Sequence, residues 1–276
     1  MCKKLSDSTG QTVYNNMVLC ELSYQKENDI KKWLQIFSAL KDQNKIFHSK
    51  YDKHLNYLLN SSSIISDGKD LMFWFRKDEE LFFVFSGTRG PLGWESNLKL
   101  KKSTLMGGTT IHQGFYDSWV NGFKPTVKLI LEYYMLGEYK VDAGGYECIR
   151  RINCIGHSRG GALATLCARD IVKNRLIPVD IVHVDVFGCP RIGNNDFVQE
   201  FKNLGFTSNY NQYCNGYDPT PEVPLYDMGY EDTISRYGKM YHWLKVPFWH
   251  QLPIVNIFDH KPKNYVKQIF KYYENK

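Results

Sequence analysis

Apolar and polar residues follow two different periods along the first third of the chain. Residues 13–24 and 30–40 repeat apolar side chains at the spacing of an amphipathic helix. Residues 71–76 and 81–86 are short apolar runs on either side of the polar turn 77–80, a pattern that predicts an antiparallel hairpin. The chain is therefore expected to begin with two helices followed by a pair of strands.

The second half alternates strand and helix patterns. A helical pattern over 115–136 is expected to be interrupted, or to begin afresh, near Pro125, because proline lacks a backbone donor. An apolar run at 151–155, an amphipathic helix at 161–172 and a β-branched run at 181–187 then follow. Strand, helix and strand in this order form a parallel pair. We predict an α/β fold with a mostly parallel, mixed central sheet flanked by helices.

Length and composition favour one folded domain. The 276 residues include 43% apolar residues, enough for a sizeable core and too many for a disordered chain. No repeat or linker divides the sequence, so we expect a single domain over 1–276, with 1–60 a helical segment packed on it and 264–272 a closing helix. The net charge of +6 is mild, and the absence of an arginine-rich tract argues against a nucleic-acid partner.

The cysteines and the first residues bear on location. The seven cysteines are an odd number without a close CxxC pair, and several lie in apolar runs, so buried thiols are favoured over disulfides or a zinc site. The opening residues, MCKKLSDSTG, lead into no apolar signal core, and no stretch approaches the roughly 18 apolar residues of a membrane span. We expect an intracellular (cytoplasmic) protein with no metal or cofactor, although a mature chain that has lost a signal would look the same.

The strongest candidate chemistry is the pentapeptide GHSRG at 156–160. It follows the predicted strand and opens the predicted helix, which is the context of a nucleophile elbow. Ser158 would then stand at a helix N-terminus, where backbone N–H groups favour a developing negative charge. We interpret Ser158 as a nucleophile.

Five segments in order extend this interpretation. They read FSGTRG at 85–90, IHQGF at 111–115, GHSRGGALATL from 156, FGCPRIGN at 187–194 and NGYDPTPEVP at 215–224. Together they resemble the class 3 (fungal-type) lipases, whose elbow most often reads GHSLGGALA. The resemblance implies an α/β-hydrolase fold and a triad in the chain order Ser, Asp, His.

A serine nucleophile needs a carboxylate-oriented base. The resemblance and its place in a loop assign the carboxylate to Asp218, over Asp185 in a predicted strand and over Asp227. Three histidines follow. His260 resembles the histidine of the family's D-H-x-x-Y segment, and His250 stays open as the alternative.

The other histidines are weaker candidates for the catalytic base. His242, like His250, lies among aromatic residues, where a histidine is more often packed than catalytic. His157 is expected to point away from the nucleophile, and His112 precedes the serine, so both are interpreted as structural.

The resemblance places the oxyanion donors at the backbone N–H groups of Thr88 and Arg159. Arg159 replaces the family's usual leucine. Our hypothesis is that its cation lies at the substrate rim and favours acyl groups near an anionic head group. Cys189 also departs from the family pattern, and we expect it to be packed and inert.

The segment 89–102 follows the oxyanion residue directly, where the family places its lid. Pro91, Trp94 and Leu98 fall at helical spacing, so this segment is either a short amphipathic lid or an ordinary exposed loop. The expected function is that of a serine carboxylic-ester hydrolase, a lipase or esterase acting on acylglycerols at a membrane or lipid-droplet surface. An acyltransferase or phospholipase variant, and a non-catalytic lipid- or protein-binding scaffold, remain the alternatives.

Overall fold

The structure is a computed structural model that describes most of the chain. The described residues are 7–42, 64–67, 70–77, 79–88, 102–104, 108–132, 134, 149–174, 177–206, 208–234, 241–244 and 259–274.

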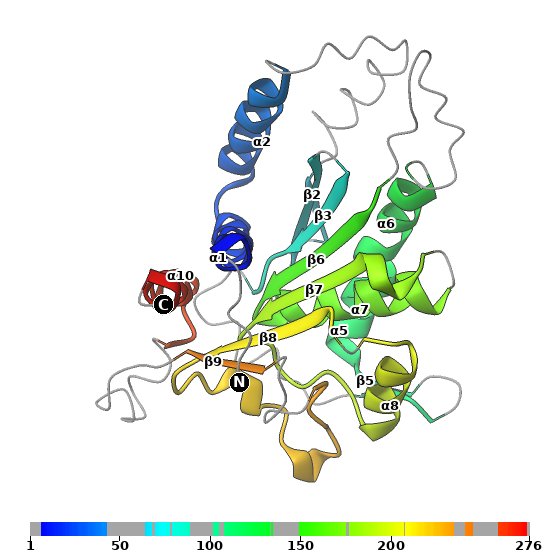
Figure 1. The fold of residues 1–276 in the computed structure, drawn as a ribbon. Coiled ribbons are helices and arrows are strands. Elements are labelled where there is room, and N and C mark those ends of the chain that lie inside the picture. The colour runs from blue at the N-terminus through cyan, green and yellow to red at the C-terminus, as the bar shows by residue number, and fades with distance from the viewer. Residues whose placement is uncertain are drawn as a thin grey trace.

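A seven-stranded sheet forms the centre of the molecule (Figure 1), in the order β1-β2-β3-β6-β7-β8-β9. The first three strands pair antiparallel, and each pairing from β3 to β9 is parallel. The predicted hairpin and the predicted mostly parallel, mixed sheet are both confirmed. The strands are β1 (Ile64–Ser66), β2 (Leu71–Lys77), β3 (Glu80–Phe85), β6 (Arg151–His157), β7 (Val182–Phe187), β8 (Tyr210–Asn215) and β9 (Tyr241–Leu244), and a separate pair joins β4 (Lys102–Thr104) to β5 (Thr110–His112).

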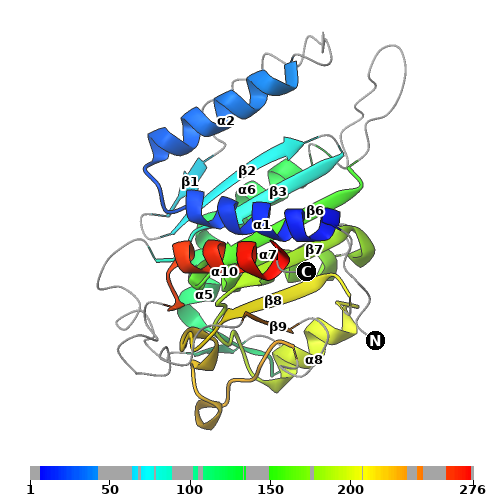
Figure 2. The same cartoon turned by 60° about the vertical axis from the view of Figure 1, so that its left-hand side comes forward.

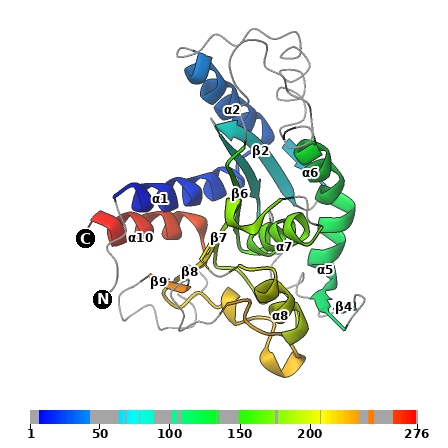
Figure 3. The same cartoon turned by 45° about the vertical axis from the view of Figure 1, so that its right-hand side comes forward.

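Helices cover both faces of this sheet. On one face, α1 (Asp7–Leu22) and α10 (Pro262–Glu274) lie side by side (Figure 2). On the other face lie α7 (Arg159–Lys173) and α6 (Lys124–Leu131), as the view along the sheet shows (Figure 3). Further helices are α2 (Glu27–Asp42), α5 (Gln113–Asp117), the π-helical turn η1 (Ser118–Phe123), α8 (Asn195–Asn203) and the 3₁₀ turns η3 (Val179–Ile181), η4 (Thr220–Glu222) and η5 (Tyr226–Met228).

The two helix layers explain why the central strands are apolar throughout. Six of the seven residues of β6 are buried, because α1 covers one face of the strand and α7 the other. Phe83 and Phe85 of β3 pack in the core on the α7 side, whereas Phe73 and Tyr265 pack in the core on the α1 side. The carboxyl ends of the parallel strands are thereby held at one edge, where the loops that bear the candidate residues begin.

The predicted long helix is broken as expected, but into three pieces. α5, η1 and α6 follow one another without a gap, and Pro125 lies in the first turn of α6. A proline there lacks the N–H that would continue the preceding helix, and the widened π-helical turn directly before it accommodates the change. Neither α8 nor the short strand β9 was predicted from the sequence.

Some expectations fall outside the described residues. Of the proposed lid segment only Lys102 is described, as the first residue of β4, and His250 is not described. The helices expected at 13–24 and 30–40 are present as α1 and α2, while the packing of all of 1–60 on a single domain stays a prediction. No helix in the described part of the chain is both long and apolar enough to cross a membrane.

Candidate active site

Ser158 occupies a sharp turn between β6 and α7. Its backbone has φ 58° and ψ −131°, a strained conformation for a residue with a side chain. The two flanking glycines make the turn feasible, because a Cβ on Gly156 would collide with the backbone of Gly160, and a Cβ on Gly160 with the backbone of Phe85. The predicted strand–turn–helix context of this serine is therefore present.

His260 and Asp218 meet Ser158 although they are far apart in the sequence. Nε2 of His260 lies 2.8 Å from Oγ of Ser158, and Nδ1 of the same ring lies 2.9 Å from Oδ2 of Asp218. Asp218 follows β8, and His260 stands just before α10, so the loops at one edge of the sheet bring all three together. The hydrogen bonds form a continuous line from carboxylate to hydroxyl.

The protonation state of this line follows from its partners. Burial by itself would raise the pKa of Asp218, but the adjacent His260 and the hydrogen bonds from Tyr265 and the Thr220 backbone outweigh burial and hold this pKa below its ordinary value. An ionised carboxylate can only accept, so Nδ1 of His260 carries the proton. In the neutral ring with its proton on Nδ1, the opposite nitrogen, Nε2, is the acceptor for the Ser158 hydroxyl.

A tyrosine and a threonine hold the carboxylate in place. Oη of Tyr265 donates to Oδ2 of Asp218 at 2.6 Å and accepts a hydrogen bond from the backbone N of Asn215 at 3.0 Å. The backbone N of Thr220 donates to Oδ1 of Asp218 at 2.8 Å, and Thr220 Oγ1 also lies 2.8 Å from Nδ1 of His260. Asp218 is therefore oriented by groups from η4 and α10, and the backbone of β8 in turn holds Tyr265.

His157 lies beside the base, and its ring bonds Tyr24 and not the nucleophile. Its ring centroid is 4.7 Å from that of His260, and its Nδ1 bonds the hydroxyl of Tyr24 at 2.8 Å. Burial and then the neighbouring His260 lower the pKa of His157 to about 3, which keeps the ring neutral. This histidine packs against the line of hydrogen bonds without joining it.

The proposed oxyanion donors flank the serine. A Cβ on Gly87, next to Thr88, would lie 3.1 Å from the Cβ of Ser158, so the segment after β3 reaches the elbow. Arg159 is the first residue of α7, where a backbone N–H has no partner within the helix. Both N–H groups are thus on segments adjacent to Ser158.

The competing candidates lie elsewhere. Asp185 is buried in β7, where Asn16 and Asn211 donate to its carboxylate. Asp227 is exposed in η5. His242, in β9, stacks on Tyr213 of β8, with ring centroids 4.6 Å apart. Among the described residues, no group of three or more Cys, His, Asp or Glu side chains could hold a metal ion.

Comparisons with known proteins identify the family. The family model for Lipase (class 3) matches residues 82–228, more than half of the chain. The chain belongs to the class 3 lipase family.

Individual class 3 lipases and their relatives are similar over shorter or more divergent stretches. A lipase of Rhizomucor miehei is 24% identical over 66% of this chain, and a secreted mono- and diacylglycerol lipase of Gibberella zeae is 31% identical over 48%. The alignments span only 48% and 31% of those relatives' lengths. A solved triacylglycerol lipase, described as having a serine protease triad as its catalytic centre, superposes with a TM-score of 0.63 at 17% identity and covers 93% of this chain and 94% of its own. This likeness confirms the predicted α/β-hydrolase fold.

Arg159, which replaces the usual leucine of class 3 lipases, does not lie where we expected it. The residue is only 8% exposed, and its guanidinium is paired with the buried Asp70. The hypothesis of a free cation at the substrate rim is therefore wrong, because the charge is neutralised inside the protein. Cys189 is buried as expected, and burial raises the pKa of its thiol, so it stays protonated.

Sequence reasoning assigned no role to three residues of the site region. Tyr265 is the tyrosine that follows His260 in the segment that resembles the family's D-H-x-x-Y, and this resemblance is the signal that could have given it a role. Tyr24 and Asp70 reach the elbow from separate parts of the chain, and the sequence carries no local signal for either contact.

Proposed function

We propose that the chain is a serine carboxylic-ester hydrolase that cleaves acyl esters of lipids such as acylglycerols. Ser158 Oγ attacks the ester carbonyl carbon while its proton passes to Nε2 of His260. The backbone N–H groups of Thr88 and Arg159 bind the oxygen that becomes negative, and Asp218 orients the base. The alcohol leaves with the proton from His260, and water then hydrolyses the acyl-enzyme by the same route.

One observation carries this proposal above the others. Ser158, His260 and Asp218 stand in a line of 2.8 Å and 2.9 Å hydrogen bonds, with the serine on a strained turn at the start of a helix. A lipid-binding scaffold without turnover has no use for this arrangement, because the strain is a cost that only an activated hydroxyl would justify.

The finer features of the proposal concern substrate, lid and location. Class 3 lipase membership supports a lipid ester, and we propose that 89–102 acts as a lid at a membrane or lipid-droplet surface and that 1–276 is one domain. The five described cysteines are buried thiols, which favours a reducing, cytoplasmic compartment. Because the Gibberella zeae relative is called secreted, imaging of the tagged protein in cells has to decide between the two locations.

The decisive experiment compares the wild type with Ser158→Ala on chromogenic esters of short to long acyl chains. We expect kcat to fall at least about 10³-fold in the variant, because the nucleophile is lost. Circular dichroism and the thermal midpoint should match between the two proteins, since the hydroxyl is removed without changing the turn. The chain-length profile of the wild type separates a lipase from an esterase.

The opposite outcomes point to the alternatives. A wild type that hydrolyses no ester, or a variant with full activity, contradicts the hydrolase and favours a scaffold. If added alcohol captures the acyl group faster than water does, product analysis assigns an acyltransferase instead. Release of fatty acid from phospholipid but not from diacylglycerol assigns a phospholipase.

A further inference from the structure

The side chain of Arg159 is fixed by hydrogen bonds to three residues and by an aromatic ring. Its Nε lies 2.8 Å from each carboxylate oxygen of Asp70. Its Nη2 donates to the backbone O of Gly114 at 2.7 Å and to Oγ of Ser118 at 2.8 Å. The guanidinium also stands 5.3 Å from the ring centroid of Phe115. These contacts leave the side chain one defined position.

Asp70 links this arginine to the segment that carries the other oxyanion donor. It directly precedes β2, and its neighbour Leu71 exchanges two hydrogen bonds with Ser86. The backbone N of Leu71 donates to Ser86 Oγ at 2.8 Å, and the backbone N of Ser86 donates to the Leu71 carbonyl at 2.7 Å. Ser86 is two residues before Thr88. The ion pair therefore connects the start of α7 with the end of β3 through the start of β2.

A third segment is held by the same guanidinium. Gly114 lies in α5 and Ser118 begins η1, so both bonds from Nη2 reach the helical stretch that packs against α7. The hydroxyl of Ser118 also hydrogen bonds to the carboxylate of Asp70. Arginine, carboxylate and hydroxyl thus form a closed, buried triangle that joins three segments around Ser158.

Stability alone does not account for this arrangement. A buried ion pair loses so much hydration that well-packed apolar residues often replace it at no cost, and leucine is the family's usual residue here. The ion pair fixes the orientation of the Arg159 guanidinium, because Nε and Nη2 each have their own acceptors. The backbone N–H proposed to bind the oxyanion belongs to Arg159 itself, so a fixed side chain restrains that N–H directly.

We propose that the side chain of Arg159, with Asp70 and Ser118, is a positioning device that sets the separation and direction of the two oxyanion N–H groups. This inference rests on the proposed function, because it deepens the role of the same site. It differs from the earlier idea of a substrate-binding cation, since the guanidinium is buried and paired with Asp70. Its effect is expected in the tetrahedral state and not in substrate binding.

The test compares three variants on a good ester substrate. Arg159→Leu should lower kcat about 10- to 100-fold with little change in KM, as expected for misplaced transition-state donors. Asp70→Asn combined with Arg159→Leu removes the unpaired carboxylate, so the urea midpoint should return towards that of the wild type while kcat stays low. Arg169→Leu is the matched control, because Arg169 is also a buried, ion-paired arginine of α7, and it should lower stability without changing kcat.

A second readout does not depend on an ester. A fluorophosphonate bonds its phosphorus to Ser158 Oγ as fluoride leaves and the proton passes to His260, and its phosphoryl oxygen lies where the oxyanion would be. Labelling should slow in Arg159→Leu to the same extent as kcat. Should Arg159→Leu fold poorly, Arg159→Lys keeps the charge but cannot reach all three acceptors, and about a tenfold loss in kcat is expected.

The outcomes separate the inference from the proposed function. A wild type that neither hydrolyses esters nor takes up the fluorophosphonate overturns both. If the wild type reacts and Arg159→Leu reacts equally fast, the inference alone is wrong. The same holds if the double variant recovers wild-type kcat along with its stability, or if Arg169→Leu slows turnover as much as Arg159→Leu does.

Discussion

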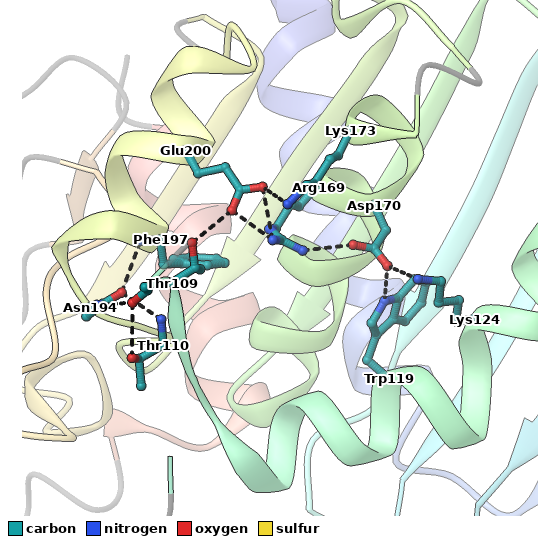
Figure 4. A network of polar contacts seen from close by, with 11 residues as sticks. Thr109, Thr110, Trp119, Lys124, Arg169, Asp170, Lys173, Asn194, Phe197 and Glu200 are labelled. Carbon is teal, nitrogen blue, oxygen red and sulfur yellow. Dashed lines mark hydrogen bonds and ion pairs between the residues drawn. The ribbon is translucent and has the colours of Figure 1, made fainter. Parts of the chain in front are cut away.

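The helix that follows the nucleophile carries a buried arginine at each end, and the two are held very differently. Arg159 opens α7 with one carboxylate, Asp70, that is 1% exposed. Arg169, in the last part of α7, shares in a larger network (Figure 4), in which it bonds Asp170 at 2.9 Å and Glu200 at 2.8 Å. The rise of a helix separates the two arginines by about 15 Å.

Lysines distinguish the second network from the first. Lys173 and Lys124 each pair with a carboxylate of the Arg169 network, and their side chains are 46% and 42% exposed. Water therefore reaches the two lysines of the network around Arg169, and each carboxylate keeps a second cation if the arginine is lost. The loss of a buried arginine is therefore expected to have different consequences at the two ends of α7. At the Arg169 end several ion pairs share the load, so the loss of one leaves the others in place. At the other end a single ion pair, Arg159–Asp70, lies next to the reacting serine.

The largest expected difference between the active site and the far end of α7 is the effect on kcat of neutralising one buried carboxylate in each. Asp218→Asn should lower kcat about 10⁴-fold, because the amide no longer holds Nδ1–H of His260 and the base takes the wrong tautomer. Glu200→Gln is the matched change at the far end of α7 and should leave kcat unchanged. Steady-state ester hydrolysis measures both. A large kcat loss in Glu200→Gln would mean that the far network also shapes the site.

Acid should destabilise the two ends of α7 in different pH ranges. Burial and then the charge of Arg159 lower the pKa of His112 to about 4. Between pH 6.5 and 4 the unfolded chain binds a proton that folded His112 does not. The free energy of unfolding therefore falls as the pH falls through this window, by up to about 3 kcal/mol. His112→Asn should remove this part of the slope and leave the part due to His157, whose pKa is also lowered, as measured by urea unfolding at several pH values.

Glu200 provides the control for this prediction. Burial raises its pKa, but hydrogen bonds and charges from Lys173 and Arg169 outweigh burial, so its pKa is lowered. A carboxyl of this kind stabilises the fold above its unfolded pKa, and that stabilisation is lost only as the pH falls through the lower folded value. Glu200→Gln should keep the slope above pH 5. An unchanged slope in His112→Asn over that range would contradict the assignment to the nucleophile end.

The sequence predicted the β6–α7–β7 unit and Ser158 because their signals are local. A strand pattern, a glycine-flanked serine and an amphipathic helix follow one another within 151–187, and the structure places each where the pattern put it. Asp218 and His260 came from the resemblance to a family and not from periodicity. Asp70 could not be predicted, because its partner Arg159 is 89 positions away and an isolated aspartate before a strand looks like an ordinary turn residue.

Tyr265 and Trp119 give the finest test of the comparison, since each donates one hydrogen bond to a buried carboxylate. Tyr265 Oη donates to Asp218 at 2.6 Å, and Trp119 Nε1 donates to Asp170 at 2.9 Å. Tyr265→Phe should lower kcat about 5- to 10-fold, because Asp218 keeps its other donors and loses only part of its orientation. Trp119→Phe should lower the urea midpoint and leave kcat as it is. Equal losses of kcat in the two variants would show that the ends of α7 are coupled, and that the division between a positioning end and a bracing end does not hold.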